Sequence, residues 1–472
     1  MSLLNVISLV GMFGLCAIAW LCSENRKLKV FPWRVVSMGI LLQLVLGAFV
    51  FVVPGTREAL SVFSNLLDGV FFAADAGARF VFGRNIVPVP GQPVDVNLGY
   101  IFAFRALPTV IFFSGLMALL QNLGVIQIIT NGFAKIFSST MRLSGAEALS
   151  GAANIFVGIE AAIVVKPYLA KMTRSELCAI LACCFGTAAS STLAIYVSFL
   201  RPVFPNILGH LVSASIIAIP ACFVLSKILV PETEIPLTLG GIPSASGETL
   251  QDPVSGETIE RVSPLDAAIV GALDGVKMAV SIAAVLILIL GLVSLINQIF
   301  ASLAGVPGVI GQLFSVIKLS NLAGAVFLPL TFLTGVSLDW HELWESSVII
   351  GRRVLETAIP PYQALAQAAS RPENPLSDRA VLIVSYALSG FAHLASMGIF
   401  VGGTIALIPS RRKDISELGW KALIVGTLAT LMIACVAGVF DTGNPGILGE
   451  KPAQPTSIAP VNSGQSTPNK LR

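Results

Sequence analysis

Residues 278–304 read MAVSIAAVLILILGLVSLINQIFASLA, a run that contains no charged side chain. A helix crosses the hydrocarbon core of a bilayer with about 20 predominantly apolar residues, so this run is long enough to span it. The rest of the chain is similar in composition. Of its 472 residues, 55% are hydrophobic and 12% are charged, and the mean hydropathy is +0.85. Soluble domains carry about 25% charged residues. The sequence therefore predicts a polytopic integral membrane protein surrounded by the lipid bilayer.

Other apolar runs of similar length predict an all-α fold with about eight transmembrane helices. Two of them are interrupted by Arg105 and His393. The run nearest the N-terminus has no basic segment before it and no clear cleavage site after it, which favours a retained span over a signal peptide. The runs lie near residues 3–22, 35–54, 99–121, 177–200, 206–230, 380–408 and 419–440.

Four further segments are hydrophobic but broken by glycine, proline or single charges. They cover residues 125–140, 144–170, 306–335 and 346–369. Such segments are tolerated at membrane depth when they are buried in protein or line a cavity. We expect them to form interfacial helices and two re-entrant hairpins.

Basic residues in short loops predict the orientation. Arg26, Lys27, Lys29 and Arg34 lie between the first two spans, and residues 411–413 precede the last one. Because cytoplasmic loops are enriched in Lys and Arg, both clusters are expected on the cytoplasmic side of the plasma (inner) membrane, with both termini outside the cytoplasm.

The net charge of +3 gives no reason to expect a nucleic-acid partner. With three histidines and no C-x-x-C spacing among seven cysteines, no metal centre or cofactor is expected.

The order of segments predicts two similar halves. Residues 1–98 would form N-terminal scaffold spans and an interfacial helix, and 441–472 a disordered tail. The first core half, 99–231, and the second, 265–440, flank a polar loop at 232–264. Interrupted apolar segments at corresponding places in two halves point to a transporter binding site within an inverted-type internal repeat.

A glutamate lies in one broken segment of each half. Burying Glu160, in NIFVGIEAAIVV, costs about 2.5–3.5 kcal/mol at mid-membrane, so it needs a partner, a proton or a water-filled cavity. The alternative is an interfacial glutamate that faces a headgroup or an arginine. Glu356 has an equally simple alternative, because Arg352 precedes it by four residues and lies on the same helix face.

His393 is in the middle of an apolar helix, with Phe391 nearby and Ser396 on the same helical face. An aromatic ring and two hydrogen-bonding groups suit a ring-bearing polar solute. The alternative is a buried histidine that satisfies a local hydrogen bond. No phosphate-binding loop or Ser/His/Asp arrangement occurs, so transport would draw on an ion gradient.

Over residues 99–440 the chain resembles the concentrative nucleoside transporter family. The resemblance rests on the order and spacing of several short motifs. They are Gly99-Tyr-Ile-Phe-Ala-Phe, Ala153-Asn-Ile-Phe-Val-Gly, Lys166-Pro-Tyr-Leu, Thr173-Arg-Ser-Glu-Leu, Ser389-Gly-Phe-Ala-His, Ser396-Met-Gly-Ile, Gly402-Gly403 and Pro409-Ser-Arg-Arg-Lys-Asp.

The resemblance implies a homotrimer that imports nucleosides by alternating access. Each protomer would hold a scaffold and a transport domain with two re-entrant hairpins and two partly unwound helices. A sodium ion would bind at Asn154, Val157, Thr187 and Ala188, with only main-chain carbonyls from the second and fourth. The nucleoside would be bound by Gly158, Ile159, Glu160, Glu356, Thr357, Phe391, His393 and Ser396.

Three departures from the family pattern fall in this pocket. The first hairpin is one residue shorter and lacks the usual Gln and Thr. Thr357 and Ala358 replace Asn and Glu in the second hairpin, and His393 replaces an asparagine.

The main hypothesis is sodium- or proton-coupled nucleoside import. One alternative keeps the transporter but changes the cargo to a nucleobase or another small polar solute. Another is a membrane-embedded enzyme that uses Glu160 and His393.

Overall fold

The computed structural model describes residues 2–53, 69–89, 101–158, 160–239, 263–308, 312, 314 and 318–449, except the side chains of residues 160, 163, 167, 190, 191 and 445. These ranges contain helices and no strand, which confirms the all-α prediction. Within these described ranges, six helical segments are long and apolar enough to cross a membrane. They are α1 (Leu3–Leu21), α2 (Trp33–Phe51), α4 with α5 (Phe102–Arg105 and Leu107–Asn122), α12 (Ile207–Leu229), α13 (Pro264–Ala304) and the segment ending in α20 (Arg412–Phe440).

Two segments predicted as spans are broken helices. Residues 177–200 are divided between α10 (Arg174–Gly186) and α11 (Ser190–Leu200), and residues 380–408 between α18 (Asp378–Leu388) and α19 (Leu394–Leu407). The interpretation of 177–200 as one clear span is therefore corrected. Hydropathy could not locate the break, because residues 186–191 are small and uncharged and lie between two apolar runs. With the six helices, these two pairs account for eight spans.

Each broken helix follows a helical hairpin. In hairpin 1, α7 (Gly145–Ala153) is joined to α8 (Glu160–Ile163), and the Ser150 hydroxyl donates to the Ala161 carbonyl oxygen at 3.1 Å. In hairpin 2, α16 (Trp340–Glu356) turns into α17 (Ile359–Ala369) through Thr357, whose φ of +73° lies in the left-handed region. The remaining helices include α6 (Val125–Met141), α9 (Lys166–Leu169) and α15 (Leu319–Leu333).

The same order of elements occurs twice. Hairpin 1, α10–α11 and α12 in the first half correspond to hairpin 2, α18–α19 and α20 in the second. The long helices α1 and α2 pack against α20 and α12. The predicted division of the chain into a scaffold, two halves, a loop and a tail stays a prediction, since residues 240–262 and 450–472 lie outside the described ranges.

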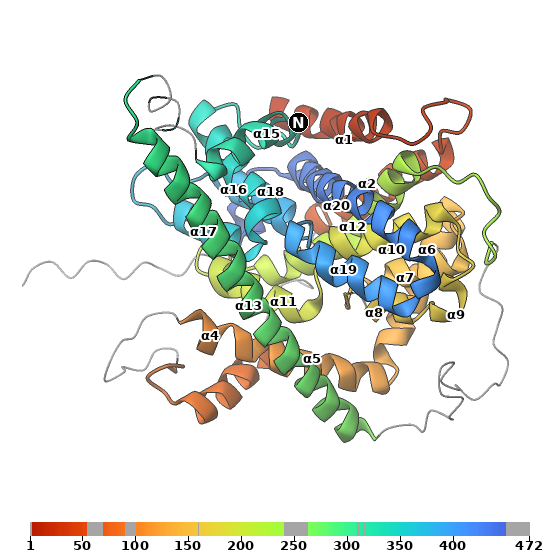
Figure 1. Cartoon of the computed structure of the whole chain (residues 1–472), viewed down its shortest axis with the longest axis horizontal. Helices are drawn as coiled ribbons and strands as arrows, with labels where there is room; N and C mark the ends of the chain where they lie inside the picture. Colours follow the sequence, from red (N-terminus) through yellow and green to blue (C-terminus); the bar gives the residue numbers. More distant parts are fainter. Residues whose placement is uncertain are drawn as a thin grey trace, which may run out of the picture.

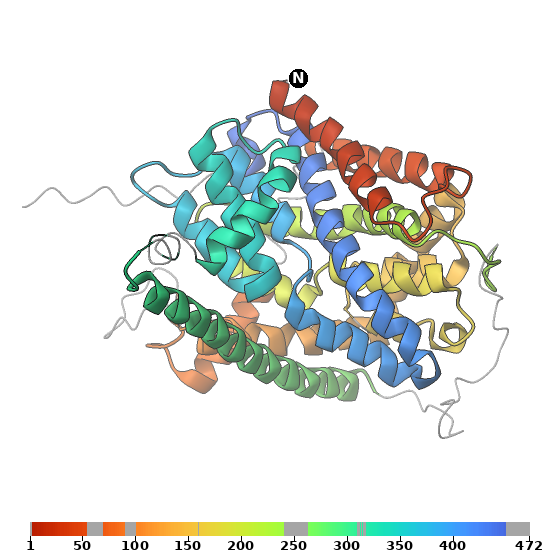
Figure 2. The same ribbon diagram turned by 45° about the horizontal axis from the view of Figure 1, so that its top comes forward.

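Helices α5 and α13 pack against each other; they lie at the lower side of the molecule in Figure 2, and α13 runs diagonally across the view of Figure 1. Glycines allow their close approach: a Cβ on Gly271 would lie 2.4 Å from the Cβ of Ala118. Only one face of α13 is buried, and apolar side chains such as Ile287 (76% exposed) lie on the others. That surface suits lipid or another protein.

Ion pairs bring the two basic clusters to the same end of the molecule. Arg174, at the start of α10, lies 3.0 Å from Glu24 in the α1–α2 loop and 3.1 Å from Glu417 in α20. Lys421 also pairs with Glu24. The start of α1 lies against the end of α20, where the Asn5 side-chain amide donates to the carbonyl oxygen of Val439 at 2.8 Å.

The Glu24 ion pairs predict a pH-dependent contribution to stability. Burial alone raises the pKa of Glu24, but hydrogen bonds from Lys421 and Arg174 outweigh it and hold the pKa below 4.5. A depressed folded-state pKa stabilises the protein at neutral pH, and this stabilisation is lost as the pH falls through that pKa. The melting temperature of the wild type should therefore exceed that of Glu24→Gln at pH 7 and converge with it in acid. A difference that does not change with pH would contradict this.

Candidate functional site

The hairpin tips and the helix breaks enclose a cavity of about 330 Å³. Small-molecule sites in proteins have volumes of roughly 300–1,000 Å³. One wall is the middle of α13, with Met278 and Ser281. The remaining lining comes from the two hairpins and the two broken helices: Gly158, Ala189, Thr192, Tyr196, Thr357, Ala358, Ile359, Phe391, His393, Ala395, Ser396, Ile399 and Phe400, with Ile282, Val285 and Leu286 from α13.

The two breaks cross in contact with each other. The Phe391 N–H donates to the Thr187 carbonyl oxygen at 3.2 Å, which joins the break of α18–α19 to that of α10–α11. A Cβ placed on Gly390 would lie 2.8 Å from the carbonyl oxygens of both Phe185 and Gly186. Only glycine permits this approach, because any side chain here would meet the backbone at the end of α10.

His393 both begins α19 and lines the cavity. Its Nδ1 accepts the Ser396 N–H at 3.2 Å, as an N-cap does. In a neutral ring this places the proton on Nε2. The Ser396 hydroxyl lies 3.0 Å from Nδ1 and 3.1 Å from Nε2. The alternative of a locally hydrogen-bonded histidine is thus observed together with a position in the cavity wall.

Aromatic rings supply two surfaces near this pair. Phe391 packs edge-on against His393 at a centroid distance of 6.1 Å and also contacts Phe400. Tyr196, in α11, stacks on Tyr362 of hairpin 2 at 4.4 Å. A planar ring entering the cavity would contact Phe391 and Tyr196, with His393 and Ser396 available for hydrogen bonds.

Glu356 is turned away from the cavity lining toward Arg352. The Arg352 Nε lies 3.0 Å from both carboxylate oxygens, and Nη2 lies 2.8 Å from Oε2. This is the simple pairing that the spacing allowed. Thr357, the next residue, does line the cavity. Ile159 lies outside the described residues, and of Glu160 only the main chain, at the start of α8, lies within them.

The residues expected at the sodium site offer oxygen atoms. Asn154 is fully buried, and its side-chain Nδ2 donates to the Ser150 carbonyl at 3.1 Å. Its Oδ1 has no hydrogen-bond partner among the described residues. The Thr187 hydroxyl donates to the Cys183 carbonyl oxygen at 2.8 Å, which leaves the oxygen lone pairs of Thr187 available. An unpartnered buried oxygen fits a hard cation such as Na⁺, to which Val157 and Ala188 would add only main-chain carbonyls.

Three family models match the sequence. They are Na⁺ dependent nucleoside transporter N-terminus over residues 10–85, Nucleoside recognition over 103–203, and Na⁺ dependent nucleoside transporter C-terminus over 210–438. A transporter of Haemophilus influenzae described as uncharacterized is 35% identical over 443 residues, which cover 93% of this chain and 98% of the relative. The chain belongs to the Na⁺-dependent nucleoside transporter family.

Further relatives agree with this assignment. The nucleoside permease NupC of Helicobacter pylori is 30% identical over 92% of the chain and 98% of its own length. The solved structure of CNTnw in an inward-facing substrate-bound state is 34% identical, covers 93% of this chain and 98% of that one, and has a TM-score of 0.79. A CNTnw variant in an outward-facing state matches with the same score. These matches confirm the family resemblance and the all-helical fold. As a member of a nucleoside transporter family, the chain is a multi-pass membrane protein and not an enzyme.

Several cavity residues of this nucleoside transporter family member were not predicted. Thr192 and Tyr196 follow the α10–α11 break at helical spacing, so a search beyond the break along α11 could have found them. Met278 and Ser281 lie in the long uncharged run. Nothing in that run distinguishes them, because their position depends on how α13 packs against the hairpins.

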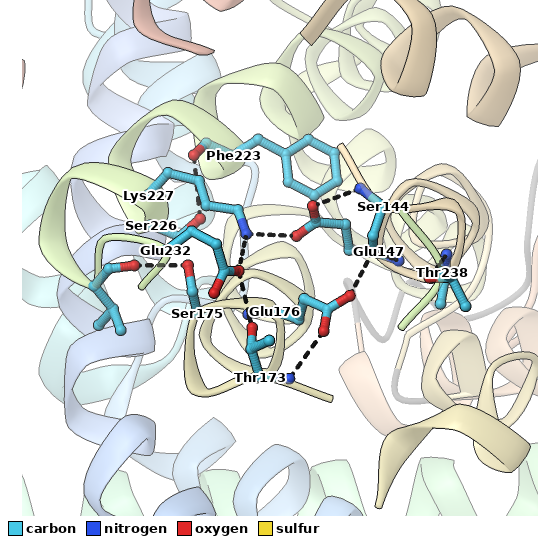
Figure 3. Close-up of polar contacts among 12 residues, drawn as sticks. Ser144, Glu147, Thr173, Ser175, Glu176, Phe223, Ser226, Lys227, Glu232 and Thr238 are labelled. Atoms are coloured by element: carbon cyan, nitrogen blue, oxygen red, sulfur yellow. Dashed lines mark hydrogen bonds and ion pairs between the residues drawn. The ribbon is translucent and has the colours of Figure 1, made fainter. Parts of the chain in front are cut away.

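A buried polar network holds hairpin 1 in place, and Figure 3 shows its contacts. Lys227, near the end of α12, lies 2.8 Å from Glu147 in α7 and 3.3 Å from Glu232 in the following loop. The Lys227 and Glu147 side chains are 5% and 2% exposed. Buried ions are tolerated when they are paired and hydrogen-bonded, so this pair fixes α7 to α12.

Two capping boxes extend the network to α10. Glu147 accepts the Ser144 N–H at 2.8 Å, and Glu176 accepts the Thr173 N–H at 2.9 Å. The Ser144 hydroxyl donates to Glu176 at 2.5 Å and thereby connects the two caps. The starts of α7 and α10 are therefore tied to each other and to α12 (Figure 3). Hairpin 1 is anchored at its base, far along the chain from its tip.

Proposed function

We propose that this chain imports nucleosides across the plasma membrane by alternating access, coupled to the inward movement of Na⁺. The cavity enclosed by both hairpin tips and both helix breaks carries the proposal, in a chain that belongs to the Na⁺-dependent nucleoside transporter family. Solved structures of CNTnw in inward-facing and outward-facing states support alternating access for this fold.

The polar and aromatic groups of the cavity suit a nucleoside. Phe391 and Tyr196 offer faces for the base, while His393, Ser396 and Thr357 offer hydrogen-bonding groups for hydroxyls or ring nitrogens. Glu160 is proposed to complete this set from hairpin 1. The unpartnered Oδ1 of Asn154 supports a Na⁺ site beside the first break. Cation binding there would order the hairpin tip and so favour cargo binding.

Uptake by the purified protein in proteoliposomes tests the proposal. Labelled uridine or adenosine should accumulate when Na⁺ is higher outside, and accumulation should collapse when monensin dissipates the Na⁺ gradient. Uptake that depends on an imposed proton gradient and not on Na⁺ would show that the coupling ion is H⁺ and not Na⁺. No uptake of any nucleoside, and no competition by one, would reject the cargo.

The second candidate keeps the transporter and replaces the nucleoside by a nucleobase or a similar small polar solute. It is favoured by the ion pair of Glu356 with Arg352, which occupies a carboxylate that would otherwise be available for ribose hydroxyls. A competition panel separates the candidates. Uridine and uracil, or adenosine and adenine, are added at equal concentration, and the better competitor of each pair identifies the cargo class.

His393→Asn is expected to change selectivity within that panel. The amide returns the asparagine of the family pattern and offers a carbonyl oxygen and two N–H donors where the neutral imidazole offers one acceptor and one donor. It can still cap α19 because asparagine is a good N-cap. We expect nucleosides to compete about tenfold better relative to nucleobases than in the wild type, the equivalent of one good hydrogen bond at about 1.4 kcal/mol. An unchanged order of competitors would remove His393 from the proposed binding set.

We further propose a homotrimer with both termini outside the cytoplasm. The exposed apolar face of α13 supports contact between protomers, and the shared end of the two basic clusters supports the orientation.

A further inference from the structure

Arg353 is the largest fully buried side chain of the described residues, and it lies in hairpin 2 near the cavity. Its Nη1 donates to the Ala387 carbonyl oxygen and, at 2.7 Å, to the Thr430 hydroxyl. No described carboxylate pairs with it, and its Nε and Nη2 are buried without a described hydrogen-bond partner. An arginine remains charged in proteins. A buried, uncompensated cation is costly, so its presence calls for an explanation.

Through Ala387, Arg353 contacts the end of α18, where the second broken helix is interrupted; its other contact, Thr430, is in α20. A helix ends with unpaired carbonyls and the negative end of its dipole. Hairpin 2 supplies donors to these carbonyls from both of its arms: Arg353 of α16 to Ala387, and the Tyr362 hydroxyl of α17 to Ser385 at 2.7 Å. The guanidinium therefore supplies the positive charge that this buried helix end favours.

The first half lacks such a cation at the corresponding place. Arg353 precedes Thr357, the C-cap of α16, by four residues; Ser150 precedes Asn154, the C-cap of α7, by four. Ser150 is neutral and fully buried, and its hydroxyl bonds within hairpin 1. At the end of α10 the donors are also neutral. The Cys183 carbonyl accepts from the Thr187 N–H and hydroxyl, and the Ala182 carbonyl accepts from the Cys222 thiol.

We propose that Arg353 is a built-in cation that occupies, at the second helix break, the place that a solution cation takes at the first. The two halves have the same order of elements, but of the corresponding C-cap residues of α7 and α16 only Asn154 has a buried oxygen, Oδ1, without a described partner, whereas the Thr357 hydroxyl accepts the Ile359 N–H at 3.4 Å. It follows that one cation binds per chain and one moves with each cargo molecule. We expect no further cation at the second break, because Arg353 already donates to the Ala387 carbonyl and Tyr362 to the Ser385 carbonyl.

The stoichiometry of the wild type tests this inference. Binding of ²²Na⁺ to the purified protein should saturate at one ion per chain, and proteoliposome uptake should move one ²²Na⁺ per nucleoside. Two ions in either measurement would overturn it. The flux ratio rests on the proposed function, but the binding count does not require a nucleoside. One bound ion with no nucleoside uptake would reject the proposed cargo alone.

Variants at Arg353 give a second test. Arg353→Lys keeps the charge and should retain a ratio of one. Arg353→Met opens the second break, and we expect uptake at low Na⁺ to fall at least tenfold, to recover in part at high Na⁺, and to move two ions per nucleoside. Arg371→Met, which removes an exposed arginine of the loop after hairpin 2, is the control and should leave uptake and ratio unchanged.

A Met variant that transports normally with a ratio of one would show that Arg353 does not act as a cation. A loss of uptake that is equal at all Na⁺ concentrations, in a protein with a normal gel-filtration profile, would show a packing role only and would also contradict the proposal. If the Met variant does not fold, the wild-type ion count still decides.

Discussion

Replacing Lys227 by methionine is expected to destabilise the protein by about 3–5 kcal/mol. The change leaves Glu147, 2% exposed, without its partner and close to Glu176 and Glu232 in the same buried network. Removing one member of a buried pair costs far more than the pair contributes, because the remaining charge cannot reach water. Thermal melting in detergent, followed by gel filtration, measures the loss.

Two companion variants make this result specific. Glu147→Gln combined with Lys227→Met removes both charges and should recover a large part of the lost stability. Lys277→Met removes a lysine that is 79% exposed on α13, and its effect should be within about 0.5 kcal/mol of zero. If Lys227→Met has the same melting temperature as the Lys277→Met control, the network does not anchor hairpin 1.

Gly390→Ala is expected to reduce uptake more than tenfold. The new methyl group would lie 2.6 Å from the Thr430 Cγ2 and 2.8 Å from two backbone carbonyl oxygens of the first break. Overpacking of this kind costs about 1–3 kcal/mol, and here relief requires the two breaks to separate. Separation would displace Phe391, whose N–H bonds to Thr187 across the crossing, and with it the cavity wall.

Gly398→Ala is the matched control for this change. Gly398 lies in α19, and a Cβ there would meet nothing within 4 Å. Alanine also has a higher helix propensity than glycine, so stability should be unchanged or slightly higher. Equal uptake by the two alanine variants would show that the crossing tolerates a wider spacing and that the cavity does not depend on it.

The fold was predictable to the extent that hydropathy determines it. Residues 278–304 and the other uncharged runs predict membrane helices directly, and glycine, proline and single charges marked four broken segments, two of which, 144–170 and 346–369, contain hairpin residues. The helix breaks could not be located in this way. At Thr187 the chain leaves the helix among small uncharged residues, and its carbonyl oxygen accepts the N–H of Phe391 from the other half of the sequence.

The candidate site was predictable in part. Phe391, His393, Ser396, Thr357 and Gly158 come together in one cavity, as their positions in the two halves suggested. Glu356 shows why a charge pattern alone is insufficient. Its spacing from Arg352 allowed both a local ion pair and a binding role, and the conformation of the side chains decides in favour of the pair. Arg353, which follows Arg352 in the sequence, is fully buried, and the spacing of charges did not distinguish the two arginines.

Equilibrium binding of labelled uridine or adenosine to the purified protein, with and without Na⁺, tests most directly whether the cargo lies between the hairpin tips and the helix breaks. Stacking of a base on an aromatic ring is worth about 1–3 kcal/mol, so Phe391→Ala should raise the dissociation constant about tenfold or more. Phe80→Ala, at a phenylalanine that is 92% exposed, should bind as the wild type does. Unchanged nucleoside affinity in a folded Phe391→Ala protein would place the cargo elsewhere and contradict this account.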